Sequence, residues 1–324
     1  MLNIKETQQL VNAELEKINF VTEPQELYTP IAYTLAQGGK RIRPVLCLMA
    51  AQLFGHQPEK ILYPALGLEV FHNFTLLHDD IMDNAEVRRN NPTVHKKWNT
   101  NAAILSGDAM MIKAHQFVCQ CDPDKLPKVI ALFNAVALGV CEGQQYDMEF
   151  ETRNDVTVEE YLEMIRLKTA ILLAGSLKMG AILANASVHE AELIYHFGIN
   201  IGLAFQLQDD FLDTFGNQDT FGKKIGGDII ANKKTFLLLT ALKKAEKEDK
   251  RNLMDWITVE DFDYNEKIEA VKKIYVKLSV DTASKNKMKE YYEKAIHCLS
   301  QIDGDYSVKN ELENFASKLM QRIN

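Results

Sequence analysis

Proline is missing from more than half of this 324-residue chain: all eight prolines lie in the first 127 residues, and none occurs from residue 128 to residue 324. Because a proline inside a helix costs about 3 kcal/mol, a long stretch without one is typical of many successive helices. Runs with the alternating pattern of half-buried β-strands are also scarce. The sequence therefore predicts an all-α fold of about ten or more helices. No low-complexity linker divides the chain, so we expect a single domain over residues 1–324.

The sequence also lacks paired cysteines, a secretory leader and a long apolar run. Its five cysteines are odd in number and include no Cys-x-x-Cys pair, which argues against a disulfide framework and favours free thiols in a reducing compartment. The first residues run directly into a charged stretch, without the apolar centre of a signal peptide. No uninterrupted apolar run approaches the roughly 18 residues that cross a bilayer. These absences predict a cytoplasmic protein without a membrane span.

Basic residues are in the minority. Lys and Arg number 37 against 45 Asp and Glu, which gives a formal net charge of −8. A protein that coats nucleic acid needs a basic face for the phosphate backbone, so we expect no nucleic-acid partner. A few local cations could still hold a small anionic ligand.

Two short segments resemble each other, and each places three aspartates at the end of an apolar run. Residues 74–83 contain Asp79, Asp80 and Asp83, and residues 205–213 contain Asp209, Asp210 and Asp213. Residues four apart on a helix share a face, so each segment would pair two carboxylates, which repel each other unless a cation lies between them. Oxygen ligands at this spacing suit Mg²⁺, which typically bridges carboxylates to the phosphates of a substrate. The six aspartates would balance about three Mg²⁺ ions at a diphosphate site.

Cations occur around both acidic segments. Residues 38–44 read GGKRIRP, a glycine turn followed by three positive charges, and such charges bind phosphates well. Arg88 and Arg89 follow the first segment, and Lys168 lies in an apolar stretch. Lys223 and Lys233 flank a glycine-rich stretch after the second segment. Together these groups predict two phosphate pockets, one that depends on metal and one that does not.

These motifs together resemble those of the trans-isoprenyl diphosphate synthases, the polyprenyl synthetase family. The matching residues, in chain order, are Gly38 to Pro44, Glu69, His72, Thr75, His78, the first three aspartates, Arg88-Arg89, Gly143-Gln144, Asp147, Lys168-Thr169, Phe205-Gln206, the second three aspartates, and Gly222-Lys223 through Asp228 to Lys233. The resemblance covers roughly residues 38–235. It implies an all-α fold, usually a homodimer, with a central cavity between the helices that carry the aspartates. It also implies head-to-tail condensation of isopentenyl diphosphate with an allylic diphosphate (dimethylallyl, geranyl or farnesyl).

The resemblance further assigns roles by motif position. Asp79, Asp83 and Asp209 would be the principal Mg²⁺ ligands, with Asp80, Asp210 and Asp213 in support. Arg88, Lys168, Lys223 and Lys233 would bind the allylic diphosphate, and Lys40, Arg43, His72 and Arg89 would bind isopentenyl diphosphate. Lys168, Thr169 and Gln206 would form the catalytic group, with Thr169 and Gln206 facing the developing carbocation.

Product length should depend on the residues that precede Asp79, because a growing prenyl chain would extend along that helix. Phe74 and Thr75 lie about one turn before Asp79, and Phe71 lies about two turns before it. These three residues are therefore the predicted floor of the pocket. By family analogy, a bulky Phe74 beside a small Thr75 favours a C20 product over C15.

Two other functions share part of this pattern. A class I terpene cyclase also ionises prenyl diphosphates with Mg²⁺, but it needs neither a second Asp-Asp-x-x-Asp segment nor the cations of a second diphosphate pocket. A non-catalytic regulatory subunit of a heteromeric synthase should have lost carboxylates or cations, and here all are intact. The last sixty or so residues carry no recognisable motif, and we expect them to form amphipathic packing helices.

Overall fold

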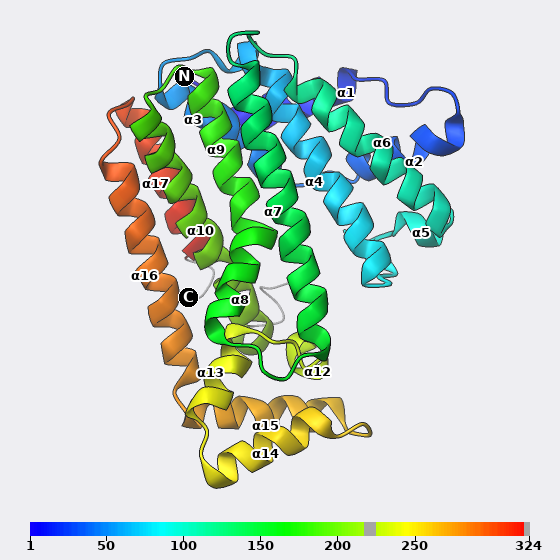
Figure 1. Ribbon diagram of the computed structural model, residues 1–324, viewed down its shortest axis with the longest axis vertical. Helices are drawn as coiled ribbons and strands as arrows, with labels where there is room; N and C mark the ends of the chain where they lie inside the picture. Colours follow the sequence, from blue (N-terminus) through cyan, green and yellow to red (C-terminus); the bar gives the residue numbers. More distant parts are fainter. Residues whose placement is uncertain (217–224, 321–324) are drawn as a thin grey trace. The chain divides into compact units, whose positions relative to one another are not determined.

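The computed structural model describes residues 1–216 and 225–320, and these residues fold into helices with a single short hairpin (Figure 1). The predicted all-α fold of about ten or more helices is confirmed. The chain forms two compact units. The first contains Met1–Ala135, Gly175–Ile194 and Asp303–Leu312; the second contains the described residues of Val136–Ala174, Tyr195–Ile302 and Glu313–Asn324. The single domain over residues 1–324 stays a prediction.

The first unit begins with helices from the N-terminal third of the chain. Its elements are α1 (Ile4–Lys17), α2 (Gln25–Ala36), α3 (Ile42–Leu53), the 3-10 turn η1 (Pro58–Ile61), α4 (Leu62–Met82), the strands β1 (Val87–Arg88) and β2 (Asn91–Pro92), α5 (Val94–Lys97) and α6 (Thr100–Val118). Four helices have residues in both units: α7 (Leu126–Thr152), α9 (Ile171–Leu183), α10 (Val188–Phe215) and α17 (Tyr306–Met320).

The core of the first unit is built around α4. This helix is apolar over most of its length, and Leu66, Val70 and Phe71 are fully buried. Its most extensive contact is with α6, which lies beside it in Figure 1. Because the body of α4 is anchored by this packing, the position of its polar C-terminal end is also fixed. That end carries the first aspartate cluster.

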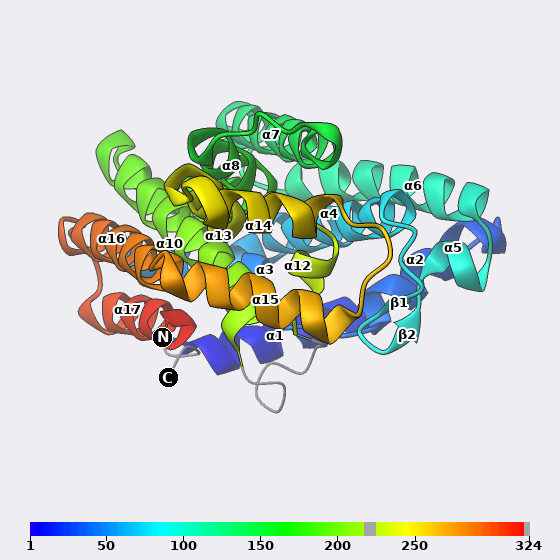
Figure 2. The same ribbon diagram turned by 90° about the horizontal axis from the view of Figure 1, so that it is seen from below.

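The second unit adds the shorter helices of the C-terminal half. Its further elements are α8 (Val158–Ile165), the π-helical turn η2 (Arg166–Ala170), α12 (Gly227–Ile230), α13 (Phe236–Lys244), α14 (Lys247–Thr258), α15 (Tyr264–Lys277) and α16 (Val280–Ser300). The helices α12 to α15 share an apolar cluster that includes Leu238, Leu253 and Val271. Figure 2 shows α14 and α15 side by side. The buried face of α15 fits the packing role expected from its sequence.

The π-helical turn η2 lies where two neighbouring helices each present a glycine. A Cβ atom at Gly143 of α7 would lie 2.3 Å from the backbone nitrogen of Lys168, and one at Gly202 of α10 would lie 2.5 Å from Cα of Ala170. Such distances leave no room for a side chain at either position. Single π-turns inside helices are rare and are frequently found at functional sites. Here the turn contains Lys168 and Thr169, two predicted site residues.

The helix α7 is the one helix among the described residues that is long and apolar enough to cross a membrane. In its most apolar stretch, 39% of the residues are buried inside the protein. The core helices of soluble proteins meet the same criteria of length and composition, so this single helix is weak evidence for a membrane span.

Candidate active site

The first aspartate cluster lies at the C-terminal end of α4. Asp79 and Asp80 occupy its last turn and Asp83 is its C-cap residue, with its backbone N–H donating to the carbonyl of Asp79 at 2.8 Å. The guanidinium of Arg88 binds this cluster: Nε donates to Oδ1 of Asp80 at 2.7 Å, and Nη2 donates to Oδ2 of Asp79 at 3.3 Å. Burial raises the pKa of Asp80, and the charge of Arg88 opposes that rise. The structure thus joins Arg88 with two of the predicted metal ligands.

A tight β-hairpin brings Arg88 back to these aspartates. Its strands β1 and β2 are connected by only Arg89 and Asn90, which have φ angles of 51° and 62°. Two positive φ angles in a two-residue connection are typical of a type I′ turn, whose twist matches that of the strands. The turn sends Arg89 in another direction, where its Nη1 donates to the carbonyl of Gly38. Adjacent arginines therefore contact different parts of the site.

The glycine turn of residues 38–44 packs against Arg89. Gly38 and Gly39 have φ angles of 75° and 139°, and a Cβ atom at Gly39 would lie 3.1 Å from the Arg89 guanidinium. Arg43 and His72 are half-buried nearby, whereas Lys40 is exposed. Burial lowers the pKa of Arg43 to about 10, so Arg43 stays charged at neutral pH.

The environment of His72 keeps its imidazole neutral. Burial, and then the charge of Arg43, lower the pKa of His72 well below its ordinary value. Arg89 acts on it in the same direction. A neutral imidazole can donate one hydrogen bond to an anion without adding charge. The structure therefore gathers Arg43, His72 and Arg89, three of the four residues predicted to bind isopentenyl diphosphate.

Arg41 was predicted only as one of the three positive charges of this turn, and the structure makes it the anchor of the turn. Arg41 has a φ of 50°, and its side chain is only 4% exposed. Its Nη1 donates to Oε1 of Glu69 at 2.8 Å, and its Nη2 donates to the carbonyl of Leu35 at 2.7 Å. Asn73 also donates to Glu69, at 3.0 Å. The sequence did not predict the pairing of Arg41 with Glu69. Its one indication was that Arg41 lies in the segment 38–44 and that Glu69 is one of the residues that match the family motifs.

The second aspartate cluster lies near the C-terminal end of α10, and Asp210 is its buried member. Asp210 is 4% exposed, and both of its oxygens accept hydrogen bonds. The hydroxyl of Tyr161 donates to Oδ2, and Nε2 of Gln206 donates to Oδ1 at 3.0 Å. Gln206 in turn accepts a hydrogen bond from the hydroxyl of Thr169 through Oε1, at 3.1 Å. Asp210 thus fixes the orientation of two residues that were predicted to face the carbocation.

Tyr161 was not predicted, because it lies 49 residues before Asp210 in a segment without a motif. It is 1% exposed. Burial raises the pKa of its hydroxyl well above the ordinary value, and the neighbouring Asp210 adds to this effect. The hydroxyl therefore remains a donor, as the hydrogen bond to Asp210 requires.

The helix α12 and the turn that follows it add a further carboxylate and a lysine to this cluster. The backbone N–H of Asp228 donates to Oδ2 of Asp213 at 2.9 Å. Burial raises the pKa values of Asp210 and Asp228, the charge of Asp210 further raises that of Asp228, and the charge of Lys233 lowers both. Lys233 therefore lies close enough to compensate the negative charge. Lys223 lies outside the described residues.

Lys168 of the π-turn pairs with a carboxylate from another motif. Its Nζ lies 2.6 Å from Oδ2 of Asp147 on α7. Gly143, one turn before Asp147 on the same helix, lies against the backbone of Lys168. The backbone and the side chain of Lys168 are therefore both held by α7. Residues 143–147 were quoted in the resemblance without a role, and the structure shows them as the support of Lys168.

The predicted floor residues form part of a column of aromatic rings on α4. Phe71 is fully buried, and its ring centroid lies 5.6 Å from that of Phe74 and 5.3 Å from that of Phe133 on α7. Phe74 also contacts His78, one turn later, at 4.8 Å. Thr75 donates its hydroxyl to the carbonyl of His72 at 2.8 Å. Phe74 therefore lies between the buried end of the column and the aspartates.

The donor chemistry of the two clusters fits Mg²⁺. Within residues 1–216 and 225–320, no three His, Cys, Asp or Glu side chains gather closely enough to hold a metal ion by themselves. Mg²⁺ commonly binds through one or two carboxylates and takes its other ligands from water and substrate phosphates. Each cluster offers carboxylates of that kind, and each has cations that would approach a bound diphosphate.

Comparisons with known proteins show which sequences and structures this chain is similar to. The sequence model of the polyprenyl synthetase family matches residues 24–277. The geranylgeranyl diphosphate synthase of Methanosarcina mazei is 40% identical over 248 residues, which are 76% of each chain. A solved geranylgeranyl pyrophosphate synthase has 43% identity and a TM-score of 0.95, with both chains fully covered. The geranylgeranyl pyrophosphate synthase of Corynebacterium glutamicum, solved with isoprenyl diphosphate and magnesium, has 26% identity and a TM-score of 0.82 over 98% of this chain and 97% of that one.

The buried pair of Arg41 and Glu69 should be important for stability. Glu69→Leu leaves the Arg41 guanidinium buried without its carboxylate, and we expect the free energy of unfolding to fall by about 3 kcal/mol or more. Glu14→Leu removes the half-buried partner of the exposed Lys17 and should change that energy by less than about 1 kcal/mol. Urea unfolding followed by circular dichroism measures both. Equal losses in the two variants would contradict the anchoring role of Arg41.

Proposed function

The chain belongs to the polyprenyl synthetase family, and from this premise we propose that it is a trans-prenyltransferase. It condenses isopentenyl diphosphate head-to-tail with an allylic diphosphate (dimethylallyl, geranyl or farnesyl) and releases a short-chain trans-prenyl diphosphate. The observation that carries the proposal is the charge pattern of the site. Two apolar helices each end in a cluster of aspartates, and each cluster has its own cations.

Both aspartate clusters serve the allylic diphosphate in this proposal. Asp79, Asp83 and Asp209 are the principal ligands of Mg²⁺, with Asp80, Asp210 and Asp213 in support and about three ions in all. Asp80 accepts from Arg88 at 2.7 Å, closer than the 3.3 Å of Asp79, and Asp210 accepts from Tyr161 and Gln206. Both Asp80 and Asp210 are also buried, which favours supporting roles for these two carboxylates. Bound Mg²⁺ would neutralise the diphosphate and make it a better leaving group.

The cations of the site divide between the two substrates. Arg88, Lys168, Lys223 and Lys233 bind the allylic diphosphate, and Lys40, Arg43, His72 and Arg89 bind isopentenyl diphosphate. The first set is supported by the contacts of Arg88 with Asp79 and by the position of Lys233 near Asp210. The second is supported by the common environment of Arg43, His72 and Arg89.

Ionisation of the allylic substrate breaks its C–O bond, and diphosphate leaves with the electron pair. The resulting cation is attacked by the double bond of isopentenyl diphosphate, a new C–C bond forms, and the released diphosphate accepts the proton that is lost. The oxygens of Thr169 and Gln206 stabilise the positive charge, because Asp210 fixes the amide of Gln206 and Gln206 orients the hydroxyl of Thr169. Dipoles held in place before the reaction need no reorganisation when the charge develops.

The activity is tested by incubating the protein with Mg²⁺, isopentenyl diphosphate and each of the C5, C10 and C15 allylic primers. We expect linear trans-prenyl diphosphates, with C20 as the main product, and no turnover when Mg²⁺ is chelated. Cyclic hydrocarbons as products would instead indicate a terpene cyclase. A protein that turns over none of the primers alone would be a regulatory subunit.

The same assay tests the metal assignment through Asp79→Asn. This change keeps the size of the side chain but removes a charge, so kcat should fall by about two orders of magnitude or more. The melting temperature should stay nearly unchanged, since the Asp79 side chain lies at a helix end and is 20% exposed. Asp124→Asn, an exposed aspartate before α7, is the matched control and should behave like the unchanged protein. Near-normal turnover of Asp79→Asn would contradict the assignment.

Product length is tested at Phe74. We expect Phe74→Ala to shift the products beyond C20, because removing this ring opens the space between the aspartates and the buried Phe71. Chromatographic sizing of the products measures the shift. Phe54→Ala, an aromatic residue at the end of α3, is the control and should keep the original product length. If Phe74→Ala also keeps that length, Phe74 is not the floor.

We propose that the protein is a homodimer and that a second copy covers an apolar face of α6. Ile104, Leu105 and Ile112 are 41%, 59% and 60% exposed, and their spacing places them along one side of the helix. Exposed apolar groups of this kind favour a protein partner. Analytical ultracentrifugation should show twice the chain mass of 36.8 kDa, and Leu105→Glu should shift it toward the monomer.

The matched control for this experiment is Val188→Glu, at an exposed apolar residue on α10. It should leave the mass unchanged. A monomeric unchanged protein, or a dimer that survives Leu105→Glu, would refute this interface.

We also propose that the protein is located in the cytoplasm. Its five cysteines are all free thiols, which supports this location, and cell fractionation would test it.

A further inference from the structure

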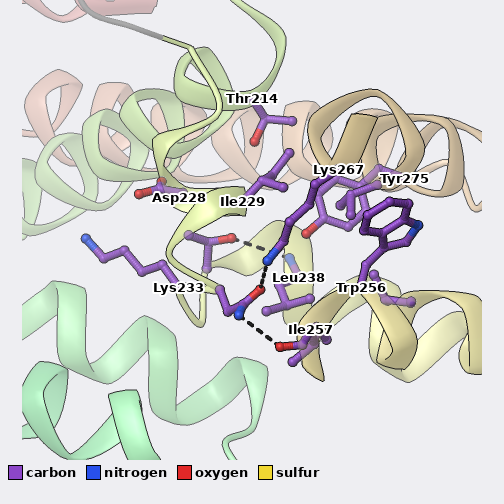
Figure 3. Close-up of a pocket in the computed structure, with 13 residues that line it drawn as sticks. Thr214, Asp228, Ile229, Lys233, Leu238, Trp256, Ile257, Lys267 and Tyr275 are labelled. Carbon is purple, nitrogen blue, oxygen red and sulfur yellow. Dashed lines mark hydrogen bonds between the residues drawn. The ribbon is translucent and has the colours of Figure 1, made fainter. Parts of the chain in front are cut away.

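A lysine of α15 is buried in the second unit. Lys267 is 1% exposed and lines a small pocket together with Asp228, Asn232, Lys233 and Tyr275 (Figure 3). Removing an ammonium group from water is costly, and burial lowers the pKa of Lys267. Among the described residues, no carboxylate forms an ion pair with it. Its polar contact is a hydrogen bond from Nζ to Oδ1 of Asn232 at 2.8 Å, and the ring of Phe262 lies 4.2 Å from Nζ.

Asn232 is held from two helices at once. Its amide nitrogen Nδ2 donates to the carbonyl of Ile257 at the end of α14, at 3.0 Å, while its oxygen accepts from Lys267 of α15. The backbone of Asn232 is left-handed, with a φ of 51°. A side chain bound at both ends fixes this uncommon conformation, and with it the direction in which the chain leaves the turn after α12.

Lys233 is the next residue after this fixed turn. Its backbone N–H donates to the carbonyl of Asp228 at 2.9 Å, so Asn232 lies within a turn closed by Asp228 and Lys233. In Figure 3 the Lys233 side chain points away from Lys267, toward the side of the turn on which Asp228 lies. The two lysines therefore have different positions: Lys267 is buried and bonds to the turn, whereas Lys233 is part of the turn and its side chain points the other way.

We propose that Lys267 is a positioning residue for the allylic diphosphate site and acts through Asn232 on Lys233. This inference rests on the proposed prenyltransferase function, in which Lys233 binds the diphosphate. The proposal gives α14 and α15 a function. Through their hydrogen bonds with Asn232, these helices fix the turn that carries Lys233, the proposed substrate-binding cation. The backbone position of Lys233 is then set before the substrate arrives, and small displacements of such a group weaken binding strongly.

The test compares variants that separate the hydrogen bond from the charge. Lys267→Met removes both and should raise the KM for the allylic diphosphate about tenfold, with the KM for isopentenyl diphosphate unchanged. Lys267→Gln keeps a donor for Asn232 but removes the charge, and it should keep the allylic KM within about twofold of the original value. Lys273→Met, an exposed lysine of the same helix, is the matched control.

Asn232→Gly tests the route of the effect, because glycine keeps the left-handed backbone but removes the bridge. It should raise the allylic KM as much as Lys267→Met, and the double variant should be no worse than either, as expected for two residues that act through one contact. Unchanged allylic KM in Asn232→Gly, or additive effects, would overturn the proposal in favour of a direct charge effect. Equal increases in both KM values would show a merely structural role.

Binding of inorganic diphosphate with Mg²⁺, measured by calorimetry, separates this inference from the proposed function. If the unchanged protein makes no prenyl product, the proposed function fails. The positioning role fails instead if Lys267→Met binds diphosphate as tightly as the unchanged protein does. Should Lys267→Met not fold, Lys267→Gln and Asn232→Gly decide the question, since the proposal requires the first to be near normal and the second to be impaired.

Discussion

Negative charge at the carboxyl ends of two apolar helices is the constraint on which the site depends. The C-terminal end of a helix already carries partial negative charge, so aspartates there are destabilised by the helix dipole and by one another. Each unit compensates with its own groups: Arg88 at the end of α4, and Tyr161, Gln206 and Lys233 near the end of α10. In the proposed function, bound Mg²⁺ would compensate the charge of these clusters further.

The sequence predicted the helices, and the aspartate clusters at the ends of two of them, because both depend on local patterns. The absence of proline after residue 127 and the apolar runs before each aspartate cluster indicated helices that end in carboxylates, and the structure has them. The partners of those groups could not be predicted. Arg41 and Glu69 are 28 residues apart, Asn232 and Lys267 are 35 apart, and Tyr161 and Asp210 are 49 apart. Such pairs are created by tertiary packing, and hydrophobic periodicity carries no information about them.

Buried polar contacts recur behind the residues that would meet a substrate. Arg41 and Glu69 hold the glycine turn, Asp210 holds Gln206, and Asp147 holds Lys168. These contacts order the long side chains when the protein folds. In the proposed reaction, the entropy of ordering them is therefore not lost again when a substrate binds. The π-helical turn at residues 166–170 contributes in the same way, since two neighbouring glycines fix its path through the second unit.

The two-residue connection of the hairpin has a geometric consequence for the proposed reaction. Arg88 contacts the aspartates, and Arg89 contacts the carbonyl of Gly38, so in the proposed reaction two consecutive residues would bind different substrates. Their Cα atoms are about 3.8 Å apart, as in any trans peptide. One peptide unit thus links the backbone of a residue proposed to bind the electrophile to that of a residue proposed to bind the nucleophile. A shift of the hairpin backbone would therefore displace both residues together.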